Sequence, residues 1–246
     1  MDLLKWHKYN KECAHPNEYE LTPYLVEDKN APVVIVCPGG GYRMIASFIE
    51  GNPVAEYFQE QGVNAFVLRY RVKEFAHYPG PLEDIAHALK DIKEQYKLSL
   101  DNYAICGFSA GGHMAALFGV EDIGYGKYGF PKPNTLMLIY PVITLEEGIA
   151  HKGSRKWFAG KDQKALEIAD VYKHVTSNYP KTFILRGDND KSVPPINSDL
   201  MIKSLLDNNV PCKYYKFRKF SHGIGLALNR KGEKWPPQAV KFWLNK

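Results

Sequence analysis

The stretch Cys106-Gly-Phe-Ser-Ala-Gly-Gly-His113 follows the apolar run 103–105 and leads into a helical pattern. A serine between glycines at such a point is typical of a nucleophile on a sharp strand-to-helix turn, because small neighbours leave room for a strained backbone. The same Gly-x-Ser-x-Gly spacing also arises in ordinary turns. The rest of the sequence therefore has to decide whether Ser109 is a nucleophile.

Short β-branched runs alternate with helical patterns from residue 32 onward. The sequence predicts strands over 32–37, 64–70, 103–106, 135–142, 182–187 and 212–217, and helices over 53–61, 81–96, from 109, over 198–206 and over 237–244. Strands separated by helices of this length indicate a mostly parallel sheet with helices on both faces. Residues 1–31 are less regular and are expected to add an antiparallel edge. We expect all 246 residues (1–246) to form a single α/β domain.

Composition and charge narrow the class of protein. The chain is 45% hydrophobic and 24% charged with a net charge of +5, which is typical of a soluble globular protein. The densest basic stretch, 213–219, alternates basic and aromatic residues as a half-buried strand does, so we prefer that interpretation to a nucleic-acid site. No run approaches the roughly 18 apolar residues of a membrane span, and residues 1–10 lack the apolar core of a signal peptide. We expect neither a nucleic-acid partner nor a membrane partner.

Cysteine usage indicates a reducing compartment. The cysteines at positions 13, 37, 106 and 212 lack C-x-x-C spacing, and two of them close apolar strands as small hydrophobes. We expect a cytoplasmic protein, while export of a longer precursor stays open. The sequence contains neither H-E-x-x-H nor a Cys/His cluster, so we expect no metal and no organic cofactor. Oligomeric state is not fixed by the sequence, and a homo-oligomer stays open.

Glycines follow the strand predicted over 32–37, in the segment Pro38-Gly39-Gly40-Gly41-Tyr42. The spacing lacks the last glycine of a dinucleotide fingerprint, and no G-K-S/T follows as in a P-loop. What remains is an oxyanion loop of the HGGG type, with proline where the histidine usually stands, or a plain glycine turn. Parallel strands bring their carboxyl ends to one edge of the sheet, so this loop is expected to meet the serine turn.

Two later strand ends supply an acid and a base. The segment 186–194 offers Asp188 and Asp190, and the segment 220–223 offers His222. The chain order serine, acid, histidine is that of α/β-hydrolases and differs from the chymotrypsin and subtilisin orders. This agreement identifies Ser109 as a nucleophile. His113, one turn further on, is expected to pack on its own helix.

With these residues, the chain resembles an α/β-hydrolase esterase of the acetylxylan-esterase-like (carbohydrate acetylesterase) group within the hormone-sensitive-lipase-like family. The resemblance covers most of the chain from about residue 30. Its segments are 38–42 with Ser47, Glu50-Gly51 and Pro53-Val-Ala55, then 68–71, 78–82 with Asp84, 107–113, 140–141, 187–194 and 221–227. It implies the α/β-hydrolase fold with a small cap segment at about 143–181, and Asp190 as the acid.

The resemblance also implies an activity. A Ser109–His222–Asp190 triad would remove short acyl groups, plausibly acetyl groups of sugars or xylooligosaccharides, through an acyl-enzyme. The expected oxyanion donors are the backbone N–H groups of Gly39, Gly40, Gly41 and Ala110. An amide hydrolase, either an arylformamidase or a peptidase, would use the same triad and stays open, although the absence of a propeller argues against an oligopeptidase. A non-catalytic binding protein of this fold would be expected to lose a triad member.

The cap segment at 143–181 bears on substrate size. It is short and charged, whereas a lid that opens on lipid should present an amphipathic helix with a large apolar face. We therefore expect a small acyl pocket and small water-soluble ester substrates. Tyr42, Trp157 and Phe158 are the candidates for contact with substrate, and the alternative for the last two is that they anchor the loop to the core.

Overall fold

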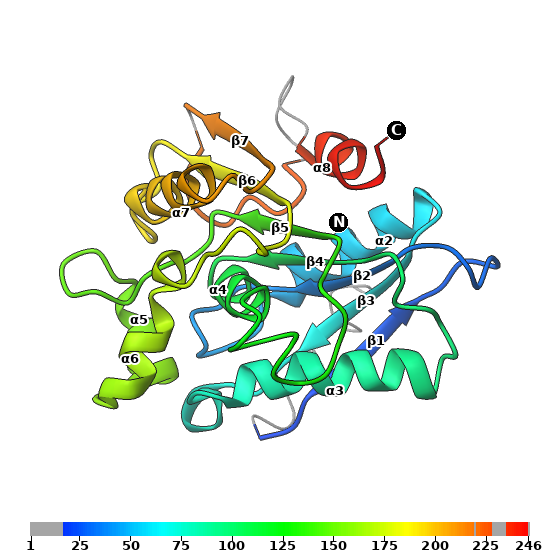
Figure 1. Cartoon of the computed structure of the whole chain (residues 1–246), viewed down its shortest axis with the longest axis horizontal. Helices are drawn as coiled ribbons and strands as arrows, with labels where there is room; N and C mark the ends of the chain where they lie inside the picture. The colour runs from blue at the N-terminus through cyan, green and yellow to red at the C-terminus, as the bar shows by residue number, and fades with distance from the viewer. Residues whose placement is uncertain (1–16, 219, 228–234, 246) are drawn as a thin grey trace.

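The computed structural model describes residues 17–218, 220–227 and 235–245, so the predictions on residues 1–10, Cys13 and Lys219 lie outside the described residues. Within the described ranges, seven strands form one sheet (Figure 1): β1 (Glu20–Tyr24), β2 (Val33–Cys37), β3 (Asn64–Arg69), β4 (Tyr103–Phe108), β5 (Thr135–Ile139), β6 (Thr182–Gly187) and β7 (Cys212–Phe217). Their order across the sheet is β1-β3-β2-β4-β5-β6-β7.

All neighbouring strands pair in parallel except β1 and β3, which pair antiparallel. In the centre of the sheet, Val33 of β2 lies opposite Asn64 of β3 and Tyr103 of β4. The strands β2, β4 and β5 are buried along their whole length, which explains their continuous apolar sequences. The predicted mostly parallel sheet with an antiparallel edge strand is confirmed.

Helices cover both faces of the sheet (Figure 1). The helices α2 (Asn52–Glu60) and α8 (Trp235–Leu244) lie on one face, and α3 (Gly80–Glu94), α4 (Ala110–Phe118) and α7 (Ile196–Asp207) lie on the other. Because side chains alternate along a strand, Val34 packs in one core with Phe58, and Ile35 packs in the other core with Leu89. The strand predicted over 135–142 ends earlier, since Tyr140 takes a φ of 40° and leaves the sheet.

The segment between β5 and β6 forms a short cap. It contains α5 (Lys152–Ser154), a π-helical turn (Arg155–Ala159), α6 (Gln163–Ala169) and a 3₁₀ turn (Val171–Lys173). Its first residues are fastened to α7, because the side-chain oxygen of Asn197 accepts the N–H groups of Ile143 and Thr144 across 2.9 and 3.1 Å. The cap is thus joined to the body by polar contacts that are themselves buried.

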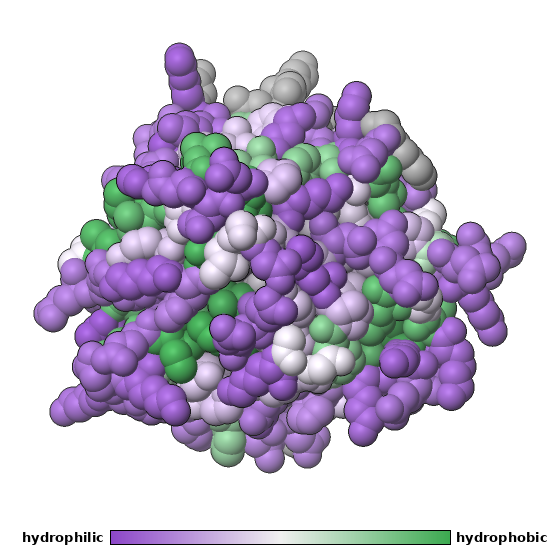
Figure 2. Space-filling model, viewed as in Figure 1, coloured by the Kyte–Doolittle hydropathy of each residue, from purple (hydrophilic) through white to green (hydrophobic). Residues whose placement is uncertain are grey.

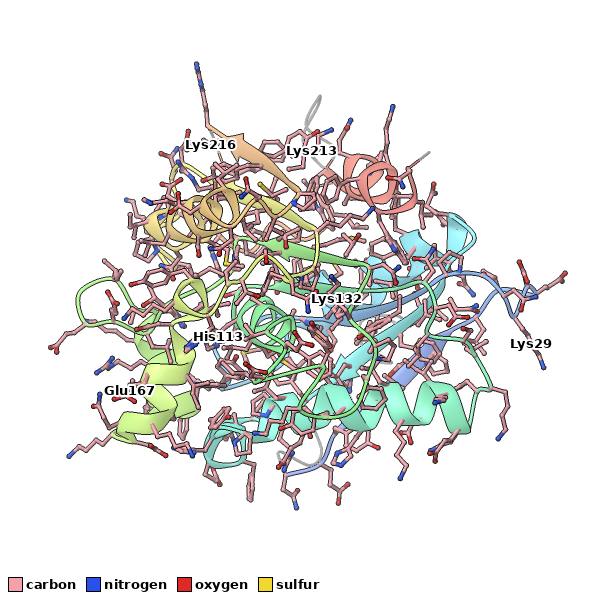
Figure 3. The ribbon with its side chains drawn as sticks, viewed as in Figure 1. Lys29, His113, Lys132, Glu167, Lys213 and Lys216 are labelled. Atoms are coloured by element: carbon pink, nitrogen blue, oxygen red, sulfur yellow. The ribbon has the colours of Figure 1, made fainter. Side chains whose placement is uncertain are left out.

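The surface is mainly hydrophilic on the face that Figure 2 shows, with small hydrophobic patches between charged side chains. Residues 212–217 form the strand β7, as predicted, but the exposed Lys213 and Lys216, labelled in Figure 3, lie on opposite faces because they are three residues apart, so they do not share one solvated face. None of the described helices is long and apolar enough to cross a membrane.

Candidate active site

Ser109 occupies the turn between β4 and α4 in a strained backbone conformation, with φ 52° and ψ −116°. Gly111 makes this turn possible, because a Cβ there would lie 2.1 Å from the carbonyl oxygen of Cys37. The N–H of Ser109 donates to Ile139, and its carbonyl oxygen accepts from Val142, both across 3.0 Å. The turn is therefore held between β2 and β5 and presents the serine at the carboxyl edge of the sheet.

Ser109, His222 and Asp190 form one chain of hydrogen bonds. Nε2 of His222 lies 2.8 Å from the serine Oγ, and Nδ1 lies 2.6 Å from Oδ2 of Asp190. Since an ionised carboxylate only accepts, Nδ1 carries the proton and Nε2 accepts from the serine hydroxyl. The side chain of Asp190 is 2% exposed and that of His222 is 21% exposed, so solvent reaches the triad at the histidine and not at the aspartate.

The loop after β6 distinguishes its two aspartates. Oδ1 of Asp190 accepts the backbone N–H groups of Ser192 and Val193, both across 2.9 Å, which aims the other oxygen at the histidine. Asp188 instead pairs with Arg186 across 2.5 Å, and its side chain is 37% exposed. Of the two carboxylates that the sequence offered, the structure brings the second to the histidine.

The glycine loop after β2 lies directly on the serine turn. A Cβ on Gly39 would lie 2.9 Å from the Cβ of Ser109. However, the N–H of Gly39 donates to Oε2 of Glu50 across 2.7 Å, so the prediction that it is a free oxyanion donor is wrong. Gly40, with φ 133°, and Ala110, whose N–H opens α4 without an intrahelical acceptor, remain candidates.

Tyr42 does not line a substrate pocket, contrary to the prediction, because it is completely buried. Its hydroxyl donates to Nδ1 of His113 across 2.8 Å, and Nε2 of that ring donates to the carbonyl oxygen of Ala169 across 2.8 Å. Burial lowers the pKa of His113 to about 4, so the ring is neutral. His113 therefore links the glycine loop to the cap, whereas the sequence predicted only packing on its own helix.

The aromatic pair of the cap divides into two roles. Phe158 is completely buried, with its ring centroid 5.3 Å from that of Tyr42 and 4.8 Å from that of His113. Its prediction as a pocket wall is wrong, and the anchoring alternative describes it. Trp157 is half-buried, with the ammonium of Lys156 4.3 Å from its ring centroid, and remains a candidate for substrate contact.

His151 faces the glycine loop from the cap, and the sequence did not single it out. A Cβ on Gly41 would lie 2.8 Å from its Cε1. Nδ1 accepts the N–H of Ser154 across 3.1 Å, which leaves the proton of the neutral ring on Nε2. Burial lowers the pKa of His151, and the nearby His222 lowers it further, so a neutral N–H donor lies beside the loop at pH 7. Gly41 and its N–H remain a candidate for the oxyanion hole.

Glu50 and Tyr140 form a buried pair beside the triad. The tyrosine hydroxyl donates to Oε1 of Glu50 across 2.7 Å, and its ring centroid lies 4.8 Å from that of His222. The sequence marked Glu50 only as part of a matching segment. Its burial could not be inferred, because it lies in a π-helical turn (Ser47–Gly51) that the hydrophobic pattern does not reveal.

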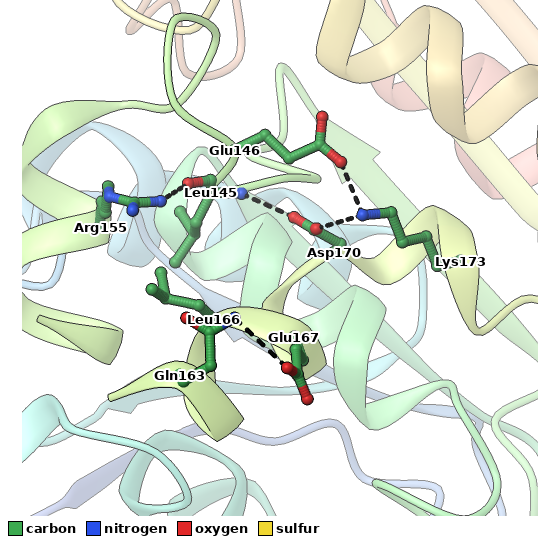
Figure 4. A pocket seen from close by; sticks show the side chains of 8 residues that line it. All are labelled: Leu145, Glu146, Arg155, Gln163, Leu166, Glu167, Asp170 and Lys173. Atoms are coloured by element: carbon green, nitrogen blue, oxygen red, sulfur yellow. Dashed lines mark hydrogen bonds and ion pairs between the residues drawn. The ribbon is translucent and has the colours of Figure 1, made fainter. Parts of the chain in front are cut away.

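A pocket of about 310 Å³ in the cap has none of the triad residues in its lining (Figure 4). It is lined by Leu145, Glu146, Arg155, Gln163, Leu166, Glu167, Asp170 and Lys173. Within it, the ammonium of Lys173 lies 2.7 Å from both Glu146 and Asp170. These groups satisfy one another and hold the cap together. Among the described residues, no cluster of His, Cys, Asp and Glu side chains is arranged to hold a metal ion.

Two family models match the chain. The BD-FAE model matches residues 22–125, and the model described as the prolyl oligopeptidase family matches residues 79–246. The second match includes the serine turn, the aspartate loop and the histidine loop.

Similar proteins extend over nearly the whole chain. The endo-1,4-beta-xylanase B of Butyrivibrio fibrisolvens is 31% identical over 95% of this chain, and the acetylxylan esterase of Xylanibacter ruminicola is 26% identical over 96%. The chain spans only 39% and 50% of the lengths of these two relatives. Among solved structures, the acetyl ester-xyloside bifunctional hydrolase from Caldicellulosiruptor lactoaceticus is 32% identical with a TM-score of 0.84, covering 96% of this chain and 91% of that one.

Proposed function

Because this chain belongs to the prolyl oligopeptidase family of α/β-hydrolases, we propose that it is a serine esterase that removes short acyl groups, chiefly acetyl, from sugars or xylooligosaccharides. The observation that carries the proposal is the hydrogen-bonded chain from Ser109 through His222 to Asp190. The names of two similar proteins, an acetylxylan esterase and an acetyl ester-xyloside bifunctional hydrolase, support acetylated sugars as the substrate class.

In the proposed reaction, the Oγ of Ser109 attacks the acyl carbon while Nε2 of His222 takes its proton. Asp190 holds the proton on Nδ1 and stabilises the imidazolium that forms. The same Nε2 then gives its proton to the leaving alcohol oxygen, which releases the sugar and leaves the acyl-enzyme. A water molecule, deprotonated by His222, hydrolyses that ester and restores the serine.

The proposed oxyanion hole consists of the N–H groups of Ala110 and Gly40 or Gly41. The opening of α4 supports the first, because helix N-terminal donors are aligned toward developing negative charge. One such donor typically lowers the barrier by about 3 kcal/mol. Gly39 is left out of this set, since its N–H is taken by a carboxylate.

We assign His151 to substrate binding. Its ring lies against the glycine loop, its Nε2–H has no acceptor among the described residues, and the charges of His222 and Asp190 act on it. An N–H donor in this position suits a hydroxyl or acyl oxygen of a sugar ester. We also propose that the protein works in the cytoplasm, which is supported by the free thiols of the described cysteines, Cys37, Cys106 and Cys212.

A substrate panel tests the proposed function. p-Nitrophenyl acetate, acetylated xylooligosaccharides, N-formylkynurenine and a peptide anilide would be compared by kcat/KM, with Ser109→Ala as the blank. We expect the acetyl esters to be hydrolysed at least tenfold faster than either amide. Faster turnover of an amide would replace the esterase by an amide hydrolase on the same triad, in keeping with the name of the matched family.

A further inference from the structure

Glu50 is a buried carboxylate that the proposed mechanism does not use. It is 4% exposed, yet each of its oxygens accepts one hydrogen bond. Oε2 accepts the N–H of Gly39 across 2.7 Å, and Oε1 accepts the hydroxyl of Tyr140 across 2.7 Å. Both contacts are made by donors, which suits the ionised carboxylate, a group that only accepts.

The second partner continues toward the histidine loop. The Tyr140 hydroxyl accepts the N–H of Gly225 across 3.1 Å, three residues after His222. The tyrosine ring also lies beside the imidazole, with centroids 4.8 Å apart. One carboxylate thus connects the glycine loop after β2 with the histidine loop after β7, two segments far apart in the sequence.

The electrostatic interactions of Glu50 also connect it with His222. Burial raises the pKa of Glu50, whereas its two hydrogen bonds and the positive charge of His222 lower it. No lysine or arginine in the described part of the chain forms an ion pair with this carboxylate. The positive charge that acts on Glu50 is therefore that of the His222 imidazolium, which forms during each turnover.

We propose that Glu50 is a positioning residue that ties the oxyanion loop to the histidine loop and stabilises the imidazolium of His222 with its negative charge. This inference rests on the proposed function of the site. Besides Glu50, the described groups that face His222 are Asp190 at Nδ1, Ser109 at Nε2, Tyr140 along the ring and, from the cap, the neutral His151.

The charge is tested with Glu50→Gln, which keeps the size of the side chain and an acceptor for Gly39. The readout is the pH dependence of two rates, kcat/KM for p-nitrophenyl acetate and the modification of Ser109 by a fluorophosphonate, since both need the neutral base. We expect the acidic limb of both profiles to move to lower pH by roughly 0.5 to 1 pH unit in Glu50→Gln, because a charge that stabilises the imidazolium is removed in a site of low dielectric constant. In addition, kcat should fall by about tenfold.

Two variants serve as controls. Glu60→Gln removes an exposed charge from α2, the helix that follows the turn of Glu50, and should leave both the acidic limb and kcat unchanged. Glu50→Asp keeps the charge while shortening the side chain, so it should lower kcat but return the acidic limb to within about 0.3 pH unit of its wild-type position. It also keeps the test open if Glu50→Gln does not fold.

Folded Glu50→Gln with an unmoved acidic limb would overturn the inference, and so would Glu50→Asp with an acidic limb moved as far as that of Glu50→Gln. The proposed function fails separately. In that case wild-type protein would not hydrolyse the acetyl esters, while the pH dependence of Ser109 modification by the fluorophosphonate, which needs no substrate, would still report whether Glu50 acts on His222.

Discussion

The carboxylate of Asp190 reaches Nδ1 of His222 across 2.6 Å while its other oxygen is fixed by two backbone N–H groups. An acceptor held in this way leaves the imidazole one orientation and one tautomer, with the lone pair of Nε2 turned to the serine. The relationship makes the loop after β6 a fixed element of the site.

We expect Asp190→Asn to lower kcat for p-nitrophenyl acetate by about 10⁴-fold, because the amide favours the wrong histidine tautomer. Asp188→Asn is the matched control two residues away, and its exposed carboxylate pairs with Arg186. That variant should keep kcat within about twofold, as exposed ion pairs contribute little. Equal losses in the two variants would contradict the assignment of the acid.

Ser109→Ala should lower ester turnover by about 10⁶-fold, since it removes the hydroxyl that His222 would activate to form the acyl-enzyme. Its thermal midpoint should stay within a few degrees of the wild-type value. Mass spectrometry of enzyme quenched during turnover should find an acyl adduct on the peptide that contains Ser109. An active alanine variant, retaining a tenth of wild-type turnover, would show that the nucleophile lies elsewhere.

His151→Ala should raise KM for acetylated xylooligosaccharides by about 5- to 20-fold, the usual effect of losing one hydrogen bond to substrate. For p-nitrophenyl acetate, which lacks the sugar, kcat/KM should change less than threefold. His174→Ala is the control within the cap, since that ring bonds the carbonyl of Glu167. A uniform loss on both substrates would mean that His151 supports the loop and does not contact the sugar.

Glu50 should also make stability depend on pH. Its folded pKa is raised by burial, so the stability that its bound proton contributes is complete below the ordinary carboxyl pKa and is lost as pH rises through the folded value. Relative to wild type, Glu50→Gln should therefore gain unfolding free energy between pH 4 and pH 7. Urea unfolding at four pH values measures this difference. A constant difference across the range would mean that Glu50 titrates alike in both states.

Acyl length gives a fifth test. The cap has only short helices and is rich in charged residues, so we expect a small acyl pocket with kcat/KM highest for acetyl or propionyl esters. A deep apolar pocket would gain about 0.8 kcal/mol for each buried methylene and would favour longer chains. The ratio would be measured on p-nitrophenyl esters from C2 to C12. A maximum at C8 or beyond, or activation by emulsions, would indicate a lipase.

The sheet was predictable because its central strands are buried on both faces and so appear as unbroken apolar runs, such as 33–36 in β2. The triad was predictable for a related reason. Parallel strands fix which loops share an edge, so Ser109 and His222 could be brought together without knowing any side-chain contact.

Side-chain direction was the part that the sequence could not supply. An aromatic residue after a run of glycines is compatible with either a pocket or a core. Tyr42 lies in the core, where His113 provides a buried acceptor for its hydroxyl. His151 was missed because its contact with Gly41 depends on the path of the cap, which no hydrophobic period describes. The burial of Glu50 was missed for a different reason, because carboxylates normally lie at the surface.

The buried ring of His113 bridges the glycine loop and the cap through Tyr42 and Ala169. Moving the cap outward would break the bond to Ala169 and leave the Nε2–H of the imidazole without that acceptor in an apolar interior. We therefore expect the cap to stay in place between one turnover and the next, so that the exchange of substrate and product does not wait for the cap to open.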